Sequence, residues 1–424
     1  MTNQRPHRVG SLPRRVLTIL GPGLITGAAD DDPSGIATYS VAGAQLGTGL
    51  LWTALVTWPL MAAVQTMCAR IGMVTGRGLM GALRHRFHRR VLVPAAAALL
   101  LANTINIGAD LSGMADAAEL LSGVSSHLWV VVFAGGIAWA TIGLRYGAIA
   151  RVLKWLTLVL FAYVVTGVYI QPPWGEVLRA TVVPTLPEGR AGWATLVAIL
   201  GTTISPYLFF WQTSQEVEEE KALGRRTLRA RRGATRQEIS DRWLDVGIGT
   251  FFSNVVMYFI ILTTAFTLHQ HGLTNPRDSR EVAEALRPLA GSFATLLYAL
   301  GLMGTGLLAI PTLSGSAAYA FAELFGWHEG IDERFTRAPA FYAVLAAAIV
   351  AGLGMDFANV NPVKALYWSA ILNGLLAPFL LTGILVAASD PRLMRGQPSS
   401  RLGRVTVGIT TVLMFAAGIA MFVV

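Results

Sequence analysis

A segment of membrane-spanning length near the start of the chain is interrupted by acidic residues and a proline. The run Asp30-Asp31-Asp32-Pro33-Ser34-Gly35 divides apolar residues that extend from about Val16 to Gly47. Inside a bilayer, non-helical backbone is tolerated only where it is buried in protein or lines a cavity, because lipid cannot satisfy its polar groups. The break therefore predicts a functional site at membrane depth.

The chemistry of this break favours a bound cation. Pro33 cannot continue the preceding helix, so the carbonyls of Gly27, Ala28 and Ala29 lose their intrahelical donors. These carbonyls lie at the negative end of a helix, where acidic side chains are destabilising. Three carboxylates at such an end predict a cation site within the membrane.

Composition places the whole chain in a membrane. Hydrophobic residues make up 54% and charged residues only 13%, about half of the ~25% that is typical of soluble domains. The net charge of +9 comes from basic residues distributed over many loops, unlike a nucleic-acid surface, which gathers them in one patch. Cys68 is the only cysteine, so it forms no intrachain disulfide, and we interpret it as a small buried apolar residue.

Several classes of function find no support in the sequence. It shows no nucleotide-binding loop, no nucleophile and base arrangement and no site for a prosthetic group, so we expect neither an enzyme nor a cofactor. We also expect no nucleic-acid partner and no obligate protein partner; the expected partners are the lipid bilayer and metal ions. The first span leads into the acidic break without a small-residue cleavage site, so we expect it to be retained.

Apolar stretches predict an all-α integral membrane protein with eleven membrane-spanning helices. Helix 1 is the interrupted segment from Val16 to Gly47, and helix 6 is interrupted in turn at Ser205-Pro206. Helices 2 to 11 are predicted at about Leu50 to Met73, Val91 to Leu121, Leu128 to Leu144, Leu153 to Ile170, Trp193 to Val217, Leu244 to Leu268, Leu289 to Phe325, Ala338 to Leu353, Val363 to Ala388 and Val405 to Val424.

The distribution of basic residues predicts the orientation. All but six of the 33 Lys and Arg residues fall in segments that lie on the same side as the N-terminus. Cytoplasmic loops carry this excess, so we expect a multi-pass protein of the cell membrane with a cytoplasmic tail at residues 1–15 and an external C-terminus. The basic connection from Lys221 to Arg242 is then cytoplasmic, and Glu216, Glu218, Glu219 and Glu220 before it are expected on a solvated face.

The positions of the two breaks predict an inverted repeat. Helices 1 and 6 lie five spans apart, so they cross the membrane in opposite directions. A single proline could be an ordinary kink, but interrupted helices at corresponding positions indicate a transporter site near the bilayer midplane. We therefore predict one repeat at residues 16–170 (helices 1 to 5), a second at residues 191–388 (helices 6 to 10), and an additional helix 11 at residues 405–424.

Motifs along most of the chain resemble a known family. They are Gly21-Pro22-Gly23, Asp32-Pro33-Ser34-Gly35 and Ala42-Gly43-Ala44-Gln45-Leu46-Gly47 in helix 1, Ala69-Arg70-Ile71-Gly72-Met73-Val74-Thr75-Gly76 after helix 2, Ala109-Asp110-Leu111 in helix 3, and the helix 6 break. The sequence resembles the natural-resistance-associated macrophage protein (Nramp) metal transporters. The resemblance implies a leucine-transporter-like fold in which a divalent metal binds between helices 1 and 6.

The metal-binding motifs depart from the family pattern. The helix 1 motif Asp-Pro-Gly-Asn reads Asp32-Pro33-Ser34-Gly35, and the helix 6 motif Met-Pro-His-Asn reads Ser205-Pro206-Tyr207-Leu208. The resemblance implies Asp32 as the side-chain ligand and the carbonyls of Ala29 and Thr202 as backbone ligands, with Ser205 offering a hydroxyl. The residues expected to shape the site are Asp31, Pro33, Ser34, Gly35, Pro206 and Tyr207.

These departures suggest a harder cation than the family usually transports. A thioether favours softer metals, whereas carboxylate, carbonyl, hydroxyl and water suit Mg²⁺, Ca²⁺ and Mn²⁺. Mg²⁺ usually keeps several waters, and we expect Gly35 and Ser205 to leave room for them. The pattern resembles the Nramp-related magnesium transporter branch, as do Ala309-Ile310-Pro311 and Ser314-Gly315-Ser316-Ala317-Ala318-Tyr319 in helix 8. We expect transport of Mg²⁺, with Mn²⁺ accepted, by alternating access.

Proton coupling is not required by the sequence. Asn103, Asn106 and Asp110 form one polar stripe on helix 3, a possible proton or polar pathway, but Asp110 can equally be a structural carboxylate. All seven histidines fall in predicted loops or termini. Three alternatives stay open. One is a proton-coupled Mn²⁺ or Fe²⁺ importer of the ordinary Nramp type. Another is a sodium-coupled amino-acid transporter of the same fold, whose substrate carboxylate three Asp residues would repel. The third is a channel-like or metal-sensing membrane protein, against which the paired broken helices argue.

Overall fold

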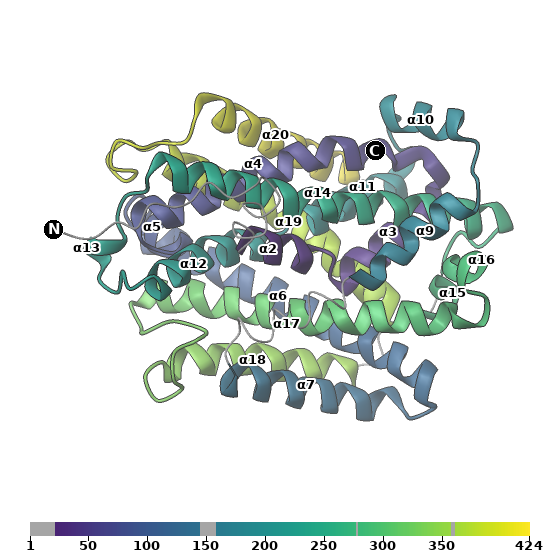
Figure 1. The fold of residues 1–424 in the computed structure, drawn as a ribbon, viewed down its shortest axis with the longest axis horizontal. Coiled ribbons are helices and arrows are strands. Elements are labelled where there is room, and N and C mark those ends of the chain that lie inside the picture. The colour runs from purple at the N-terminus through teal and green to yellow at the C-terminus, as the bar shows by residue number, and fades with distance from the viewer. Residues whose placement is uncertain (1–21, 145–157, 277–278, 358–360) are drawn as a thin grey trace, which may run out of the picture.

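The computed structural model describes residues 22–144, 158–276, 279–357 and 361–424, and within these every regular element is a helix (Figure 1). Nine helical stretches of the described residues are long and apolar enough to cross a membrane. The prediction of an all-α membrane protein is thereby confirmed.

Helix 1 is broken at the acidic run, as predicted. α2 (Pro22–Asp30) and α3 (Pro33–Leu46) lie on either side of the break, and each is too short to span a bilayer alone. Pro33 opens α3, where its missing N–H costs nothing. Asp32 is the N-cap, with its carboxylate accepting the Gly35 N–H at 2.7 Å. The predicted residues 16–21 of helix 1 and the tail at 1–15 lie outside the described residues.

Helix 6 is broken in the same way. α11 (Gly189–Thr203) ends before Ser205, and α12 (Pro206–Ala222) begins with its own proline. The break lies at the predicted Ser205-Pro206 position, although the helix extends further at both ends than the predicted Trp193 to Val217. In both interrupted helices, the first half-helix ends three residues before a proline, and that proline begins the second half-helix.

Most of the other predicted spans begin and end within a few residues of the observed helices. They are α4 (Trp52–Thr75), α6 (Arg89–Ser122), α7 (Ser126–Gly143), α17 (Ala294–Phe325), α18 (Pro339–Asp356), α19 (Pro362–Ser389) and α20 (Arg401–Val423). α9 (Phe161–Tyr169) accounts for the end of helix 5, and the predicted start of that helix, residues 153–157, lies outside the described residues.

Helix 7 begins earlier than predicted. α14 runs from Arg236 to Thr267, whereas we expected a start near Leu244. The cause is a capping box in which Thr235 and Glu238 satisfy each other's backbone donors. The connection from Lys221 to Arg242 is therefore shorter than predicted, and it contains a further helix, α13 (Leu228–Arg231).

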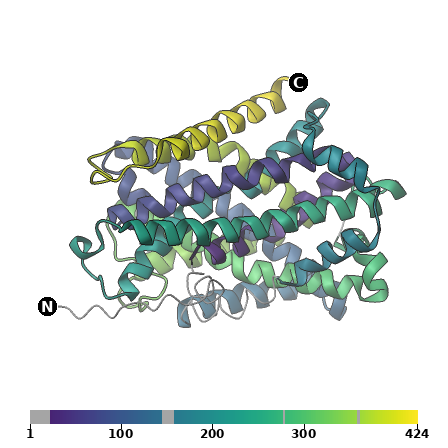
Figure 2. The ribbon, with the colours of Figure 1, turned by 45° about the horizontal axis from the view of Figure 1, so that its top comes forward.

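The broken helices lie inside the bundle. α2 and α3 occupy its centre in Figure 1, packed against α14, α12 and α11. Figure 2 shows α20 lying along the outside of the bundle, where it packs on α19 and α11. The break between α2 and α3 is therefore surrounded by α14, α12 and α11.

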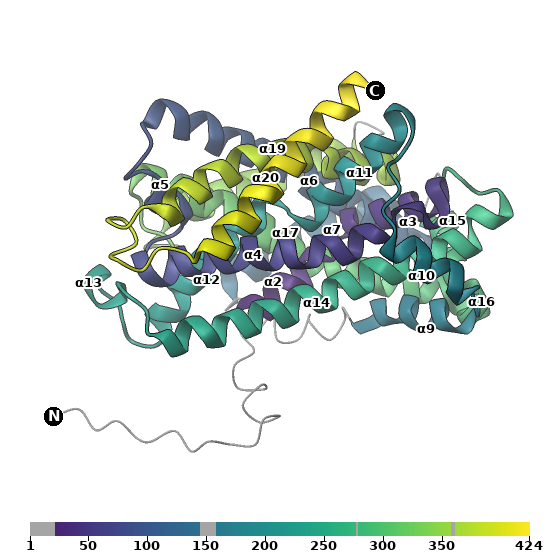
Figure 3. The ribbon, with the colours of Figure 1, turned by 90° about the horizontal axis from the view of Figure 1, so that it is seen from above.

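The two ends of the bundle carry different short elements. One end holds α5 (Leu79–Leu83), α13 and the link between α19 and α20, and the other holds α10 (Trp174–Val182), α15 (Ser279–Ala283) and α16 (Arg287–Ala290) (Figure 3). The end with α5 is the predicted cytoplasmic end, and the described C-terminus lies toward the other.

Small residues allow α2 to sit directly against α14. A Cβ on Gly27 would lie 2.4 Å from the backbone of Gly249, which is closer than atoms can approach. Glycine on both helices therefore brings the two backbones into contact and fixes the height of the following acidic run in the bundle.

Candidate metal site

Asp32 is the centre of the candidate site. Its side chain is 1% exposed. One carboxylate oxygen accepts the Ser34 hydroxyl at 2.6 Å and the Gly35 N–H at 2.7 Å, while the other accepts the Asn106 amide at 3.1 Å. These donors come from α3 and α6. Each of these donors stabilises negative charge on Asp32 and so offsets part of the cost of burying a carboxylate.

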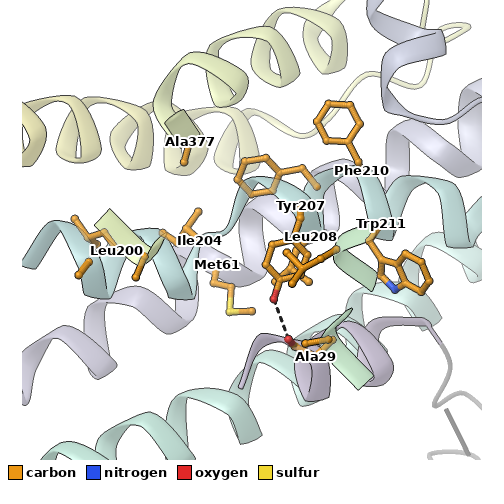
Figure 4. Packing of buried hydrophobic residues seen from close by; sticks show 14 of the residues in the cluster. Ala29, Met61, Leu200, Ile204, Tyr207, Leu208, Phe210, Trp211 and Ala377 are labelled. Carbon is orange, nitrogen blue, oxygen red and sulfur yellow. Dashed lines mark hydrogen bonds between the residues drawn. The ribbon is translucent and has the colours of Figure 1, made fainter. Parts of the chain in front are cut away.

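Tyr207 joins the two broken helices across the site. Its hydroxyl donates to the Ala29 carbonyl at 2.9 Å and lies 3.4 Å from the second carboxylate oxygen of Asp32. Figure 4 shows the ring directed from α12 toward Ala29. Two predicted oxygen ligands, the Ala29 carbonyl and Asp32, therefore face the same phenolic group.

The helix 6 side of the site carries a carbonyl and two hydroxyls. The Ser205 hydroxyl donates to the carbonyls of Thr202 at 2.6 Å and Gly201 at 2.8 Å. The Thr202 hydroxyl lies 3.5 Å from that of Ser34. The Ser205 hydroxyl therefore donates its proton to α11, and its oxygen lone pairs remain available. The contact between Thr202 and Ser34 places the end of α11 beside the start of α3.

Asp30 and Asp31 are directed to a different partner. The Ser253 hydroxyl on α14 donates to Asp30 at 2.6 Å and to Asp31 at 3.2 Å. The other Asp30 oxygen has no hydrogen-bond partner among the described residues. Ser253 was missed by the sequence reasoning; the signal available was an adjacent polar pair, Ser253-Asn254, within an apolar span.

The polar stripe on α6 divides into two roles. Asn106 donates to both Asp32 and Asp110, at 3.1 and 3.3 Å. Asn103 instead donates to the Leu313 carbonyl and the Ser316 hydroxyl of α17, both at 2.8 Å. Asn106 and Asp110 therefore extend the site along α6, whereas Asn103 fastens α6 to α17.

The space that we expected beside Gly35 is largely filled. A Cβ at this position would lie 3.3 Å from the Thr202 hydroxyl and 3.4 Å from the ring of Tyr39. The glycine therefore serves close packing of α3 against α11 and does not open a hollow for water on that side.

Histidine and thiol ligands are absent from the described part of the site. The described residues contain no group of three or more His, Cys, Asp and Glu side chains arranged to hold a metal. Cys68 is free and buried, as predicted. The buried acidic side chains around the two breaks are Asp30, Asp31, Asp32 and Asp110.

An ion-pair network closes the predicted cytoplasmic side of α2. Asp245 on α14 accepts the N–H groups of Gly23 and Leu24 at 2.8 and 3.1 Å. Arg242 lies 2.6 Å from Asp245 and 2.8 Å from Glu216 on α12, and it also pairs with Glu219. The start of α2 is thereby tied to α12 through α14.

A second link joins the same helices directly. Thr26 on α2 donates to Gln212 on α12 at 2.6 Å, and Gln212 donates to Glu216 at 2.7 Å. The prediction of a solvated glutamate face is wrong for two of the four residues, since Glu216 is 1% and Glu220 5% exposed. Both are buried because arginines, Arg242 and Arg225, pair with them.

Sequence comparisons match this architecture to one family. The family model described as natural resistance-associated macrophage protein-like matches residues 23–424. A divalent metal cation transporter, MntH, of Klebsiella pneumoniae (strain 342) is 28% identical over 419 residues, which are 96% of this chain and 94% of that protein.

Solved structures share the fold. The manganese transporter of Eremococcus coleocola superimposes with a TM-score of 0.73 at 19% identity, covering 99% of this chain and 90% of that one. Mhp1, a nucleobase-cation-symport-1 family transporter, superimposes with a TM-score of 0.57 at 17% identity, covering 95% and 90%. The leucine-transporter-like fold that the family resemblance implied is thereby confirmed.

The match over nearly the whole chain settles the family and the class of protein. Members are multi-pass membrane transporters and not enzymes, and the metal ion is their substrate and not a cofactor. The chain belongs to the natural resistance-associated macrophage protein-like (Nramp) family of divalent metal transporters.

Proposed function

We propose that this chain transports hard divalent cations, Mg²⁺ first and Mn²⁺ second, by alternating access around the breaks in α2–α3 and α11–α12. The observation that carries the proposal is the setting of Asp32. Among the residues that the structure describes, it is the one carboxylate that lies within reach of a donor from each of α3, α6 and α12. An ion there would contact elements that alternating access moves relative to one another.

We take the ligands to be Asp32 and the carbonyls of Ala29 and Thr202. In the structure both carbonyls accept hydroxyl protons, from Tyr207 and Ser205 respectively. An entering cation replaces these protons, so both hydroxyls must turn and can then present oxygen lone pairs. Such an all-oxygen set, completed by water, is the environment that Mg²⁺ and Mn²⁺ accept.

Softer ions find less support in the side chains nearby. Met61 and Met257 are the thioethers that hydrogen-bond around the break, and each already accepts from a polar group, Asn254 and Thr203 respectively. A sulfur ligand would favour transition metals. Because these sulfurs have partners on α14 and α11, they are poorly placed to replace the missing helix 6 methionine.

Voltage alone is sufficient to drive uptake. A divalent ion gains about 4.6 kcal/mol per 100 mV of inside-negative potential, which corresponds to roughly three decades of accumulation. We therefore propose transport that is not strictly coupled to protons. We further propose the cell membrane as the location, a cytoplasmic N-terminus, and residues 16–170 and 191–388 as the two repeats.

The second candidate is a proton-coupled Mn²⁺ or Fe²⁺ importer. The observation that favours it is the continuous chain Asp32, Asn106 and Asp110, which offers a second carboxylate beside the ligand. Family membership leaves no support for an amino-acid transporter, because the likeness to Mhp1 extends only to the fold.

One experiment separates these candidates. Purified protein in liposomes is supplied with Mg²⁺, Mn²⁺ or Fe²⁺ under a fixed membrane potential, with and without a pH gradient. The proposal requires Mg²⁺ uptake that follows voltage and is insensitive to the gradient. Uptake of Mn²⁺ or Fe²⁺ alone, or uptake that needs the gradient, would favour the second candidate.

A further inference from the structure

A cavity lined by arginines lies at the predicted cytoplasmic end of the bundle. Its volume is about 510 Å³, and none of its lining residues belongs to the broken helices. The lining comes from three connections that are distant in the sequence, between α4 and α6, between α13 and α14, and between α19 and α20 (Figure 3). The basic residues that face it are Arg77, His85, Arg86, Arg232, Arg392 and Arg395.

Hydrogen bonds that do not involve the arginines lining the cavity hold the three connections together. Gln397 exchanges two bonds with the backbone of Ala234, at 3.0 and 3.3 Å. The carbonyl of Gln397 also accepts from Arg70 at 3.1 Å, and Gly233 donates to the Val74 carbonyl at 2.9 Å. The cavity is therefore built without using the charged groups of its own arginines.

The positive charge in this cavity exceeds the negative charge that the protein places beside it, since five arginines and one carboxylate line it. Within the described parts of the chain, none of the five lining arginines forms an ion pair. The one lining carboxylate, Asp390, accepts the N–H groups of Arg392 and Leu393, which lowers its pKa and uses it to shape the turn. Burial and the charges of neighbouring arginines lower the pKa of Arg77. Four of the five lining arginines are exposed to solvent and only Arg77 is partly buried, so the cavity presents a concentrated positive charge that attracts an anion.

Backbone strain occurs at the same place. Arg395 has a φ of +49°, and only one other non-glycine residue of the described chain, Gln171, has a positive φ. A side chain in this region is disfavoured, and glycine is the ordinary occupant. Strained residues of this kind persist mainly at functional sites, so the guanidinium of Arg395 is held in the cavity at a cost in backbone energy.

An adjoining cavity adds an apolar wall. It has a volume of about 600 Å³ and shares Arg86, Asp390 and Arg392 with the first. Its other side is lined by Leu385 and Val386, which lie in the last turns of the membrane-spanning α19. The second cavity therefore places the apolar side chains of Leu385 and Val386 beside Arg86 and Arg392, at the end of a membrane-spanning helix.

We propose that these joined cavities bind an acidic phospholipid, with its phosphate among Arg77, Arg86, Arg232, Arg392 and Arg395 and its acyl chain along Leu385 and Val386. Guanidinium groups match phosphate oxygens in pairs, and basic pockets at the cytoplasmic side of membrane helices bind such headgroups. A free phosphate shares the headgroup chemistry, but it would leave the apolar cavity unused. The site is independent of the transported ion.

The test compares thermal unfolding of the full chain in neutral detergent with and without added lipid. A ligand that binds only the folded state raises the unfolding temperature. We expect phosphatidylglycerol to raise it more than phosphatidylcholine does. In R86Q/R392Q this difference should fall by at least half, whereas in R179Q/R280Q, which removes two exposed arginines from the opposite end, it should be unchanged. Equal differences in the two variants would overturn the proposal.

A second pair of variants avoids ambiguity from misfolding. Arg395→Gly removes one guanidinium and relieves the positive φ, so it should unfold at an equal or higher temperature while losing part of the phosphatidylglycerol effect. Gln171→Gly relieves the same strain outside the cavity and should keep the whole effect. An undiminished effect in Arg395→Gly would count against the site. If glycerol phosphate reproduces the shift, the ligand is a soluble phosphate and the lipid assignment fails.

Discussion

The hydroxyl of Tyr207 lies 2.9 Å from the carbonyl oxygen of Ala29, so a residue that follows the helix 6 break donates to the last turn before the helix 1 break. The same hydroxyl is 3.4 Å from Asp32. Both acceptors are proposed metal ligands. The Tyr207 hydroxyl proton and a bound cation therefore compete for the same oxygen atoms. The contact is therefore a place where binding of a cation and the packing of α12 on α2 are linked.

Tyr207→Phe tests this link. Removal of the hydroxyl leaves the buried Ala29 carbonyl without its donor, which should cost about 1–3 kcal/mol of unfolding free energy. Added Mg²⁺ should then stabilise the variant more than the wild type, because no proton has to be displaced. Thermal unfolding across a Mg²⁺ titration measures both effects. Tyr163→Phe is the control, since Tyr163 is equally buried but lies on α9. Equal Mg²⁺ stabilisation of all three proteins would contradict the proposed ligand set.

Asp32 should be indispensable for transport. Asp32→Ala is expected to abolish metal uptake into liposomes, but it also removes the N-cap of α3, worth about 0.5–2 kcal/mol. Asp32→Ser keeps a capping oxygen without the carboxylate, so it should fold better than Asp32→Ala and be equally inactive. Asp116→Asn removes a carboxylate elsewhere on α6 and should retain uptake. Normal uptake by inserted Asp32→Ser would reject Asp32 as a ligand.

The sequence predicted the helices better than their contacts. Proline and three aspartates at membrane depth have few structural solutions, so the two breaks were evident from Pro33 and Pro206. Ser253 was not evident, because its contact with Asp30 spans 223 positions of the chain and a single serine is ordinary in a membrane helix. The filling of the space beside Gly35 by Thr202 depends on how closely α3 approaches α11, a distance that no local pattern encodes.

Arg242 is expected to hold the predicted cytoplasmic side closed. Arg242→Ala leaves Glu216 and Asp245 buried without their countercharge, which should cost about 3–5 kcal/mol of unfolding free energy. Arg242→Ala with Glu216→Gln should cost less than the single change, because one orphaned charge is removed. Chemical unfolding of both proteins measures this. Arg287→Ala, which breaks an exposed pair with Glu284, should change stability by about 1 kcal/mol or less. If Arg242→Ala lowers the unfolding free energy no more than Arg287→Ala does, the ion-pair network does not stabilise the packing of α2.

Metal uptake should not be coupled to proton uptake. The chain from Asp32 through Asn106 reaches one further carboxylate, Asp110, and the described histidines lie at helix ends or in connections. A pH-sensitive dye inside the liposomes should therefore show no metal-dependent acidification beyond leak. Asp110→Asn should keep voltage-driven Mg²⁺ uptake. A metal-dependent fall in internal pH that Asp110→Asn removes would establish coupling through this residue.

Selectivity should follow the two departures from the family motifs. Ser205→Met supplies a soft donor at the helix 6 break, and Gly35→Asn supplies an amide at the helix 1 break, so the double variant should shift competitive uptake from Mg²⁺ toward Mn²⁺. Any side chain at Gly35 crowds Thr202, with its Cβ 3.3 Å from that hydroxyl. Gly35→Ala therefore serves as the matched control, because it adds the Cβ without a ligand and should lower uptake of both metals alike. The measurement is the ratio of Mn²⁺ to Mg²⁺ taken up at equal amounts of inserted protein. An active double variant with the wild-type ratio would mean that these positions do not set selectivity, and the preference for Mg²⁺ would lose its physical basis.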